Sequence, residues 1–222
     1  MRDNSDFIVY QPKVFSDQEI GERSKLYYTQ MDQRRSIRMF SDKPVPKEVM
    51  ETIIKTAGTA PSGAHKQPWT FCLISNPELK TKIREAAEKE EHESYNGRMS
   101  DEWLKDLAQF GTNWEKPFIE TVPWIIVVFK KIYDVDEGEK KTNYYVSESV
   151  GIACGMLISA IHNAGLCTLT HTPSPMNFLS KILDRPSNER PFLLLPVGHA
   201  SDDAVVPNLD RKSLEEIRIS FD

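Results

Sequence analysis

The stretch TAPSGAHKQPWTFCLIS, residues 59–75, joins a turn of small residues to an apolar run. Pro61 and Ser62 interrupt the chain, Gly63 bends it without a Cβ, and Pro68 stiffens the exit. The apolar run that begins at Trp69 predicts a buried strand over 69–75. Such a turn directly before a strand indicates that another group approaches the backbone closely, because larger side chains would keep it away.

Helical patterns lie on both sides of this turn. The helix over 16–31 begins with SDQE, in which Ser16 and Glu19 form a capping box. In PKEVMETIIKTAG, residues 46–58, Pro46 begins a helix and Gly58 caps its end. The apolar face of that helix carries Val49, Ile53, Ile54 and Ala57. Asn76 caps the next helix, over 76–91, whose inward residues are Leu79, Ile83, Ala86 and Ala87.

The second half of the chain continues to alternate strands and helices. PWIIVVFK, residues 123–130, is typical of a strand buried on both faces. A helix over about 145–163 follows, with small residues that favour close helix packing: Gly151, Ala153, Gly155 and Ala160. LCTLT (166–170) and FLLLPVG (192–198) predict two more strands, and Ser174 caps a short helix between them. This alternation leaves open whether the sheet is parallel, antiparallel or mixed.

The bulk properties indicate one soluble domain with an N-terminal arm. The chain has 222 residues, of which 39% are apolar and 27% charged. The net charge of −5 argues against non-specific nucleic-acid binding, since phosphate contact needs a basic surface. Cys72, Cys154 and Cys167 lack CxxC spacing, which indicates reduced core residues of a cytoplasmic protein. Polar residues interrupt the apolar region 146–164, so we expect a buried helix there and no membrane span.

Three polar motifs could bind a ligand. RRSIR, residues 34–38, makes a phosphate clamp from guanidinium forks and a hydroxyl, although a solvated basic helix end is the alternative. DRK, residues 210–212, is a second, weaker basic site. THTP, residues 170–173, offers hydroxyls at a strand end, or is an ordinary strand exit. The sequence contains no GxGxxG motif or Walker loop, and its five histidines lack zinc-ligand spacing, so we expect no metal.

The segment EKEEHESYNGRMSDEWLKDL, residues 88–107, combines dense charge with large apolar side chains at helical intervals. Glu91 and Tyr95 are four residues apart and therefore share a helical face. Downstream, TNWEKPF (112–118) places Lys116 between two aromatic residues. A carboxylate, a phenol and an ammonium together could hold an amino-acid zwitterion. A solvated surface helix is the alternative interpretation.

Taken in this order, the motifs resemble a known family. RRSIRMFSDKPVPKEVMETIIKTAGTAPSGAHKQPWTF (34–71) resembles the N-terminal signature of the nitroreductase superfamily of FMN flavoproteins. PSGAHKQPW, EEHESYNGRM, TNWEKPF, THTP and LLPVG are similar, more narrowly, to the iodotyrosine deiodinase family within it. Vertebrate members of that family carry an N-terminal membrane anchor. The N-terminal residues here lack such an apolar run, so we expect the chain to resemble a soluble version.

The resemblance implies a role for particular residues. FMN phosphate and ribityl binding would fall to Arg34, Arg35, Ser36, Arg38 and Arg211. Pro61, Ser62 and Gly63 would run beside the flavin ring, with Thr170, His171 and Thr172 on its other side. The Thr172 hydroxyl would bond flavin N5, and the Ala64 N–H would bond the substrate phenolate. Glu91, Tyr95 and Lys116 would grip the substrate zwitterion and close a lid of residues 88–118.

The implied fold is an α+β sandwich around a mixed, largely antiparallel sheet, in a homodimer that exchanges terminal segments and shares two active sites. An arm and helix over 1–30 would precede an FMN domain over 31–222. The implied reaction is reductive dehalogenation of mono- and diiodotyrosine, and by extension bromo- and chlorotyrosine. The sequence does not name the electron donor, for which a partner NAD(P)H-dependent reductase is the hypothesis. A general nitroreductase or flavin reductase, or a non-catalytic sensor of flavin or halotyrosine, are the alternatives.

Overall fold

The computed structural model describes residues 7–221, so the first six residues of the predicted N-terminal arm lie outside the described part. The chain divides into two compact units, Met1–Arg34 and Arg35–Asp222. The first contains helix α1 (Asp17–Asp32), and its predicted capping box is confirmed. The Glu19 N–H donates to Ser16 Oγ at 3.3 Å, and the Ser16 N–H donates to Glu19 Oε2 at 2.8 Å. Within the described residues, α1 has no buried side chain.

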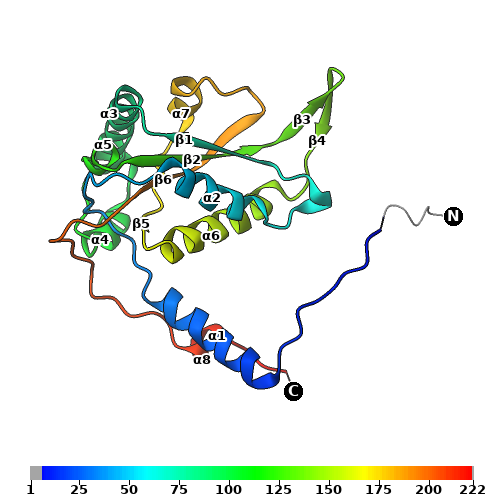
Figure 1. The fold of residues 1–222 in the computed structure, drawn as a ribbon. Helices are drawn as coiled ribbons and strands as arrows, with labels where there is room; N and C mark the ends of the chain where they lie inside the picture. Colours follow the sequence, from blue (N-terminus) through cyan, green and yellow to red (C-terminus); the bar gives the residue numbers. More distant parts are fainter. Residues whose placement is uncertain (1–6, 222) are drawn as a thin grey trace. The chain divides into compact units, whose positions relative to one another are not determined.

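A four-stranded sheet forms the centre of the second unit, in the order β1-β2-β6-β5 (Figure 1). The strands are β1 (Trp69–Ile74), β2 (Trp124–Lys131), β5 (Cys167–Thr168) and β6 (Glu189–Gly198). Each neighbouring pair is antiparallel, which settles the direction that the sequence pattern left open. The expected strand over 166–170 is shorter than predicted, and pairing resumes at His171, which forms an isolated bridge with Leu194.

Helices cover both faces of this sheet (Figure 1). On one face, α2 (Lys47–Gly58) and α6 (Val146–Asn163) pack through Met50 and Leu157 on Ile126 and Val128 of β2. On the other, α3 (Pro77–Glu93), α5 (Phe118–Thr121) and α7 (Asn177–Ile182) pack on the alternate strand positions, such as Val127. This confirms that β2 is buried on both faces. Each fully buried aliphatic side chain contributes roughly 1.5–3 kcal/mol through removal from water.

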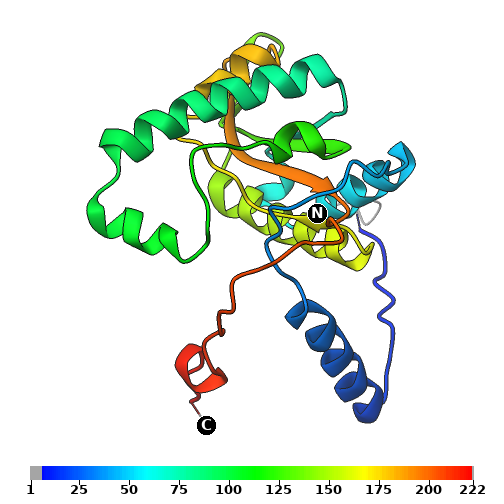
Figure 2. The ribbon, with the colours of Figure 1, turned by 90° about the vertical axis from the view of Figure 1, so that its left-hand side faces the viewer.

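The chain between α3 and α5 extends away from the sheet. Figure 2 shows α3 crossing the face of the sheet, after which the chain reverses through α4 (Asp101–Ala108) and returns to α5. A π-helical turn, Ser94–Arg98, joins the end of α3 to this excursion. The hairpin of β3 (Tyr133–Asp136) and β4 (Glu139–Thr142) and the short helix α8 (Leu214–Ile217) complete the unit. The hairpin was not predicted from the sequence.

Several local predictions were wrong. Val49 is 36% exposed, and Met50 takes its place in the buried stripe of α2 because it is spaced three and seven residues from Ile53 and Ala57. Gly58 is the last helical residue, and Thr59 caps the helix.

Ser174 does not cap α7, which begins at Asn177 after Met176. In α6, a Cβ added to Gly151 or Gly155 would meet no atom within 4 Å among the described residues, so these glycines do not serve close packing within the chain. The described residues include no helix that is both long and apolar enough to span a membrane.

Candidate active site

A cavity of about 250 Å³ opens where the end of α3, α4, the loop before α5 and the segment after β5 meet. A parallel bridge between Ser36 and Thr168, with the Ile37 N–H donating to Thr168 O at 3.2 Å, brings Arg38 to the same place. The cavity is lined by Arg38, Glu91, Tyr95, Met99, Trp103, Leu107, Thr112, Lys116, Phe118, Leu169, Thr170, His171 and Thr172. It therefore collects residues from four of the motifs singled out in the sequence: RRSIR, the segment 88–107, TNWEKPF and THTP.

Glu91, Tyr95 and Lys116 form a charged group in this cavity. The Lys116 ammonium lies 3.5 Å from Glu91 Oε2, and the two side chains are 4% and 13% exposed. Lys116 Nζ also lies 5.6 Å from the centre of the Tyr95 ring. Helical spacing places Glu91 and Tyr95 on one face of α3 and its π-helical extension. The structure thus brings the three residues together, and their binding of a substrate stays a prediction.

Burial shifts the pKa values of all three groups towards their neutral forms. It raises the pKa of Glu91, a rise that the Lys116 charge opposes. It lowers the pKa of Lys116, a fall that Glu91 opposes. Burial and the Glu91 charge raise the pKa of the Tyr95 phenol, which shares a hydrogen bond with Thr112. Glu91 and Lys116 thus keep each other charged. Burying either charge without the other would cost free energy.

Arg38 contributes a cation on another side of the cavity. Its guanidinium is half-buried and lies 5.6 Å from the centre of the Phe110 ring. Burial lowers the pKa of Arg38. Because an arginine stays charged in proteins, a partly desolvated guanidinium here favours an anionic or electron-rich ligand.

The side chains of Thr170, His171 and Thr172 alternate between exposed and buried positions. Thr170 and Thr172 are exposed and line the cavity, whereas His171 is only 6% exposed. The His171 ring packs edge-on against Phe118 at 5.9 Å. Burial, followed by the charges of Lys116 and Arg38, lowers the pKa of His171 to about 3. Within the described chain, His171 Nε2 has no hydrogen-bonding partner. The imidazole is therefore neutral, and the two hydroxyls are the groups available to a ligand.

The turn at residues 61–67 does not line this cavity. Ala64, His65 and Gln67 have φ angles of 48°, 55° and 47°, a left-handed conformation that strains side chains with a Cβ. A Cβ on Gly63 would lie 2.9 Å from Tyr145 Cδ2, so within this chain the glycine makes room for the residues that begin α6.

Hydrogen bonds hold that turn in place. The Gly63 N–H donates to Ser149 Oγ at 3.3 Å, and the Gln67 N–H donates to Ser62 Oγ at 2.9 Å. The His65 and Lys66 N–H groups donate to Ser62 O and Gly63 O, each at 3.0 Å. The N–H groups of Gly63 and His65, on either side of Ala64, therefore donate hydrogen bonds within the chain.

The remaining predicted FMN residues are not among those that line the cavity. The Arg35 guanidinium donates to Pro207 O, and Ser36 makes the bridge to Thr168. Arg34 ends the first unit, and Arg211 lies in the exposed C-terminal segment. Their roles in binding FMN, and that of Pro61–Gly63, stay predictions.

Sequence reasoning missed three contributors to the site. Thr112 contacts Tyr95, Phe118 supports His171, and Glu88 accepts a hydrogen bond from the Lys116 N–H. Glu88 precedes Glu91 by three residues and therefore lies on the same face of α3. That spacing could have predicted Glu88 from the sequence. The other two depend on how the 112–118 loop folds back, which no periodicity encodes.

Comparison with known proteins shows the family to which this chain belongs. The sequence pattern of the Nitroreductase family matches residues 31–199. The chain belongs to the nitroreductase family and, within it, to the group of iodotyrosine deiodinases.

The relatives named iodotyrosine deiodinase include one from Haliscomenobacter hydrossis, 59% identical over 222 residues and covering 100% of both chains. Iodotyrosine deiodinase 1 from Homo sapiens is 42% identical over 220 residues, covering 98% of this chain and 76% of that protein. A crystal structure of oxidized iodotyrosine deiodinase bound to FMN and 3-iodo-L-tyrosine superposes with a TM-score of 0.75 at 28% identity. That match covers 88% of this chain and 98% of the other.

Proposed function

We propose that this protein is an FMN-dependent enzyme that reductively removes iodide from mono- and diiodotyrosine. The observation that carries the proposal is the buried Glu91–Lys116 pair beside Tyr95. A general nitroaromatic substrate has no α-amino and α-carboxylate groups for these charges to bind. The pair instead matches an amino acid, and the relative solved with FMN and 3-iodo-L-tyrosine supports that substrate class.

The amino-acid end of the substrate exchanges partners with the ion pair. Glu91 accepts hydrogen bonds from the substrate ammonium, while Lys116 and the Tyr95 hydroxyl donate to its carboxylate. Because both side chains are already desolvated, this exchange replaces one buried pair with two at small additional cost. Met99, Trp103 and Leu107 from the lid segment, proposed as residues 88–118, then cover the substrate and exclude water.

The donor set of the cavity fits FMN. Arg38 supplies a cation, Thr170 and Thr172 supply hydroxyls, and Phe118 supplies an apolar wall. We place the phosphate and ribityl chain at Arg34, Arg35, Ser36, Arg38 and Arg211, with His171 a buried neutral neighbour and the Thr172 hydroxyl donating to the flavin ring. Reduced FMN supplies the two electrons that, with one proton, convert the carbon–iodine bond into a carbon–hydrogen bond and iodide.

The strained turn supplies the other end of the substrate site. The Ala64 N–H donates to the substrate phenolate, which keeps the halogenated ring electron-rich and fixed in position. Because Pro61–Ala64 do not line the cavity of their own chain, the turn serves the site of a second subunit.

The protein is a homodimer that exchanges its terminal segments and so completes both sites. Exposed apolar side chains at both ends support this assembly, among them Ile20 and Leu26 of α1 and Ile217, Ile219 and Phe221 near the C-terminus. Light scattering on a sizing column should give twice the mass of one chain. A monomeric mass with FMN bound would contradict a shared site.

We further propose a separate NAD(P)H-dependent reductase as the electron donor. The free thiols of Cys72, Cys154 and Cys167 support a reducing, cytoplasmic location. Reduction of bound FMN by NADH or NADPH alone, at a rate equal to turnover, would remove the need for a donor protein.

An anaerobic single-turnover experiment tests the activity. Protein carrying FMN reduced with dithionite is mixed with 3-iodotyrosine, and tyrosine and iodide are quantified by chromatography. We expect both products in proportion to bound FMN. Lys116→Met should abolish product formation at low substrate concentration, while Lys89→Met, an exposed lysine of α3, should not.

Other outcomes identify the alternatives. If the reduced protein binds 3-iodotyrosine but forms no tyrosine, the deiodinase proposal fails and a binding protein for halotyrosine or flavin is left. A general nitroreductase would give a different result. The wild-type protein would turn over iodotyrosine no faster than a nitroaromatic, and Lys116→Met would turn over both at the wild-type rates.

A further inference from the structure

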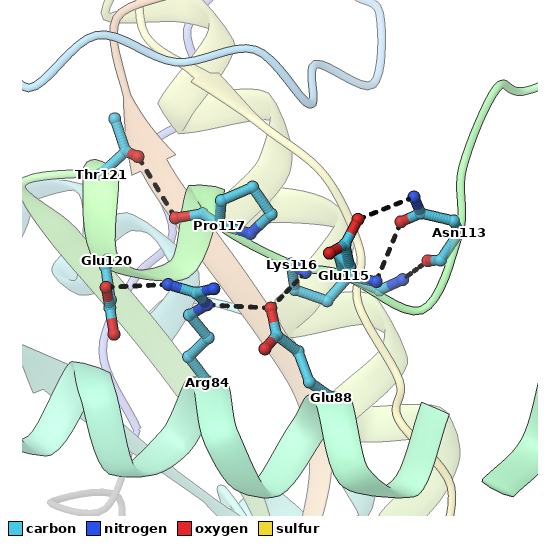
Figure 3. Close-up of polar contacts among 8 residues, drawn as sticks. All are labelled: Arg84, Glu88, Asn113, Glu115, Lys116, Pro117, Glu120 and Thr121. Carbon is cyan, nitrogen blue, oxygen red and sulfur yellow. Dashed lines mark hydrogen bonds and ion pairs between the residues drawn. The ribbon is translucent and has the colours of Figure 1, made fainter. Parts of the chain in front are cut away.

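Helix α3 presents two carboxylates, one turn apart, to the same residue of the loop before α5. Glu91 Oε2 lies 3.5 Å from the Lys116 ammonium. Glu88 Oε1 accepts a hydrogen bond of 2.7 Å from the Lys116 backbone N–H (Figure 3). Lys116 is therefore bound at both its main chain and its side chain by one helix face.

Glu88 is itself fixed by an arginine one turn earlier. Arg84 Nε lies 2.9 Å from Glu88 Oε1, and Arg84 Nη1 lies 3.1 Å from Glu120 Oε2 of α5 (Figure 3). The Glu88 side chain is 15% exposed. The same carboxylate oxygen thus joins α3 to the loop, while the arginine joins α3 to the helix that follows the loop.

The loop supplies further bonds around Lys116. The Lys116 ammonium donates to Asn113 O, and the Glu115 N–H donates to Asn113 Oδ1 at 2.9 Å (Figure 3). These local bonds shape the loop but contain no link to α3. Glu88 provides that link for the backbone of Lys116.

We propose that Glu88 is a positioning residue for substrate recognition: it fixes the Lys116 main chain so that the ammonium stays buried beside Glu91. A lysine with four flexible side-chain bonds tends to extend its ammonium into water. Holding its backbone against α3 fixes the point from which the side chain starts, so that the ammonium, buried at 4% exposure, stays within reach of Glu91 and Asn113 O. This inference rests on the proposed function, in which Lys116 binds the substrate carboxylate.

The proposal predicts a selective loss of affinity. In the FMN-bound protein, Glu88→Ala should weaken 3-iodotyrosine binding about 10- to 100-fold, the range expected for loss of a hydrogen bond to a charged acceptor. Binding of 2-iodophenol, which lacks the amino-acid end, should change by less than about twofold, because it does not contact Lys116. Quenching of FMN fluorescence measures both affinities.

Two further variants sharpen the test. Glu88→Gln keeps an acceptor for the Lys116 N–H but loses the charge that holds Arg84, so its effect should be smaller than that of Glu88→Ala. Glu85→Ala is the matched control, because Glu85 is an exposed glutamate of the same helix outside the site. Amide exchange by NMR gives a readout without any substrate: the Lys116 N–H should exchange at least about tenfold faster in Glu88→Ala.

The result that overturns the proposal is equal affinity of Glu88→Ala and Glu85→Ala for 3-iodotyrosine. Equal weakening of both ligands, with loss of FMN, would also overturn it, because that pattern marks a general structural role. Failure of the proposed function would show differently: the wild-type protein would give no fluorescence response to 3-iodotyrosine, whatever the exchange rate of the Lys116 amide.

Discussion

The buried His171 should make the stability of this protein depend on pH in a way that one substitution removes. Its pKa is lowered to about 3 by burial and by the charges of Lys116 and Arg38, whereas an unfolded histidine titrates near 6.5. Between these values the unfolded chain binds a proton that the folded chain does not. Stability is therefore complete above the unfolded pKa and is lost as the pH falls towards the folded one.

The size of the effect follows from the same two values. At pH 7 the histidine contributes almost no pH dependence, because both states are largely neutral. At pH 5 protonation of the unfolded state lowers the free energy of unfolding by about 2 kcal/mol relative to pH 7. Below about pH 3 the loss should level off, since both states then carry the proton.

Urea denaturation of the wild-type protein and of His171→Asn, at saturating FMN, measures the difference. Asparagine is polar and cannot titrate, so the variant should lose about 2 kcal/mol less stability between pH 7 and 5. His92→Asn, at an exposed position, is the control and should follow the wild type. Parallel pH profiles for wild type and His171→Asn would refute the reasoning, even if the variant were less stable throughout.

Three other perturbations test the packing around the site. Lys116→Met leaves the Glu91 carboxylate buried alone, so the free energy of unfolding should fall by about 3 kcal/mol. Adding Glu91→Gln should restore most of that lost stability. A double variant less stable than Lys116→Met would contradict the ion pair. Gly63→Ala should cost about 1–3 kcal/mol in urea denaturation through its clash with Tyr145, and an unchanged midpoint would show that the ring moves freely. Lys80→Met removes the ammonium that donates to the carbonyl oxygens of Glu120 and Val122, at 2.8 and 2.7 Å, at the end of α5, and should lower thermal stability by about 1–3 kcal/mol. An equally stable variant would mean that water replaces the ammonium.

Local sequence signals predicted much of the fold. The capping box at Ser16, the Asn76 cap and the apolar run of β2 each depend on neighbours in sequence, and each was confirmed. The wrong assignments, such as Val49 as a core residue, came from choosing between adjacent positions on a helix. Strand direction was not predictable from alternation, because it depends on contacts between segments far apart in the chain.

The site was predicted in part for the same reason. Glu91 and Tyr95 follow helical spacing, and the arrival of Lys116 beside them was proposed from chemistry and from the family resemblance. The contacts of Thr112 and Phe118 arise when the loop folds back on α3, so they needed the structure. The left-handed conformation of Ala64 and His65 was not foreseen, since the sequence placed the bend at Gly63.

Under the proposed function, the Glu91–Lys116 pair also affects how the substrate reaches the cavity. The pair has no net charge, and neither has the zwitterionic end of an amino acid, so there is no long-range attraction between them despite the chain's net charge of −5. Such short-range complementarity acts only at contact, well within the Debye length of about 10 Å at 0.1 M salt. The amino-acid end should therefore add little salt dependence to diffusional capture, and its contribution to selectivity should arise in the dissociation rate.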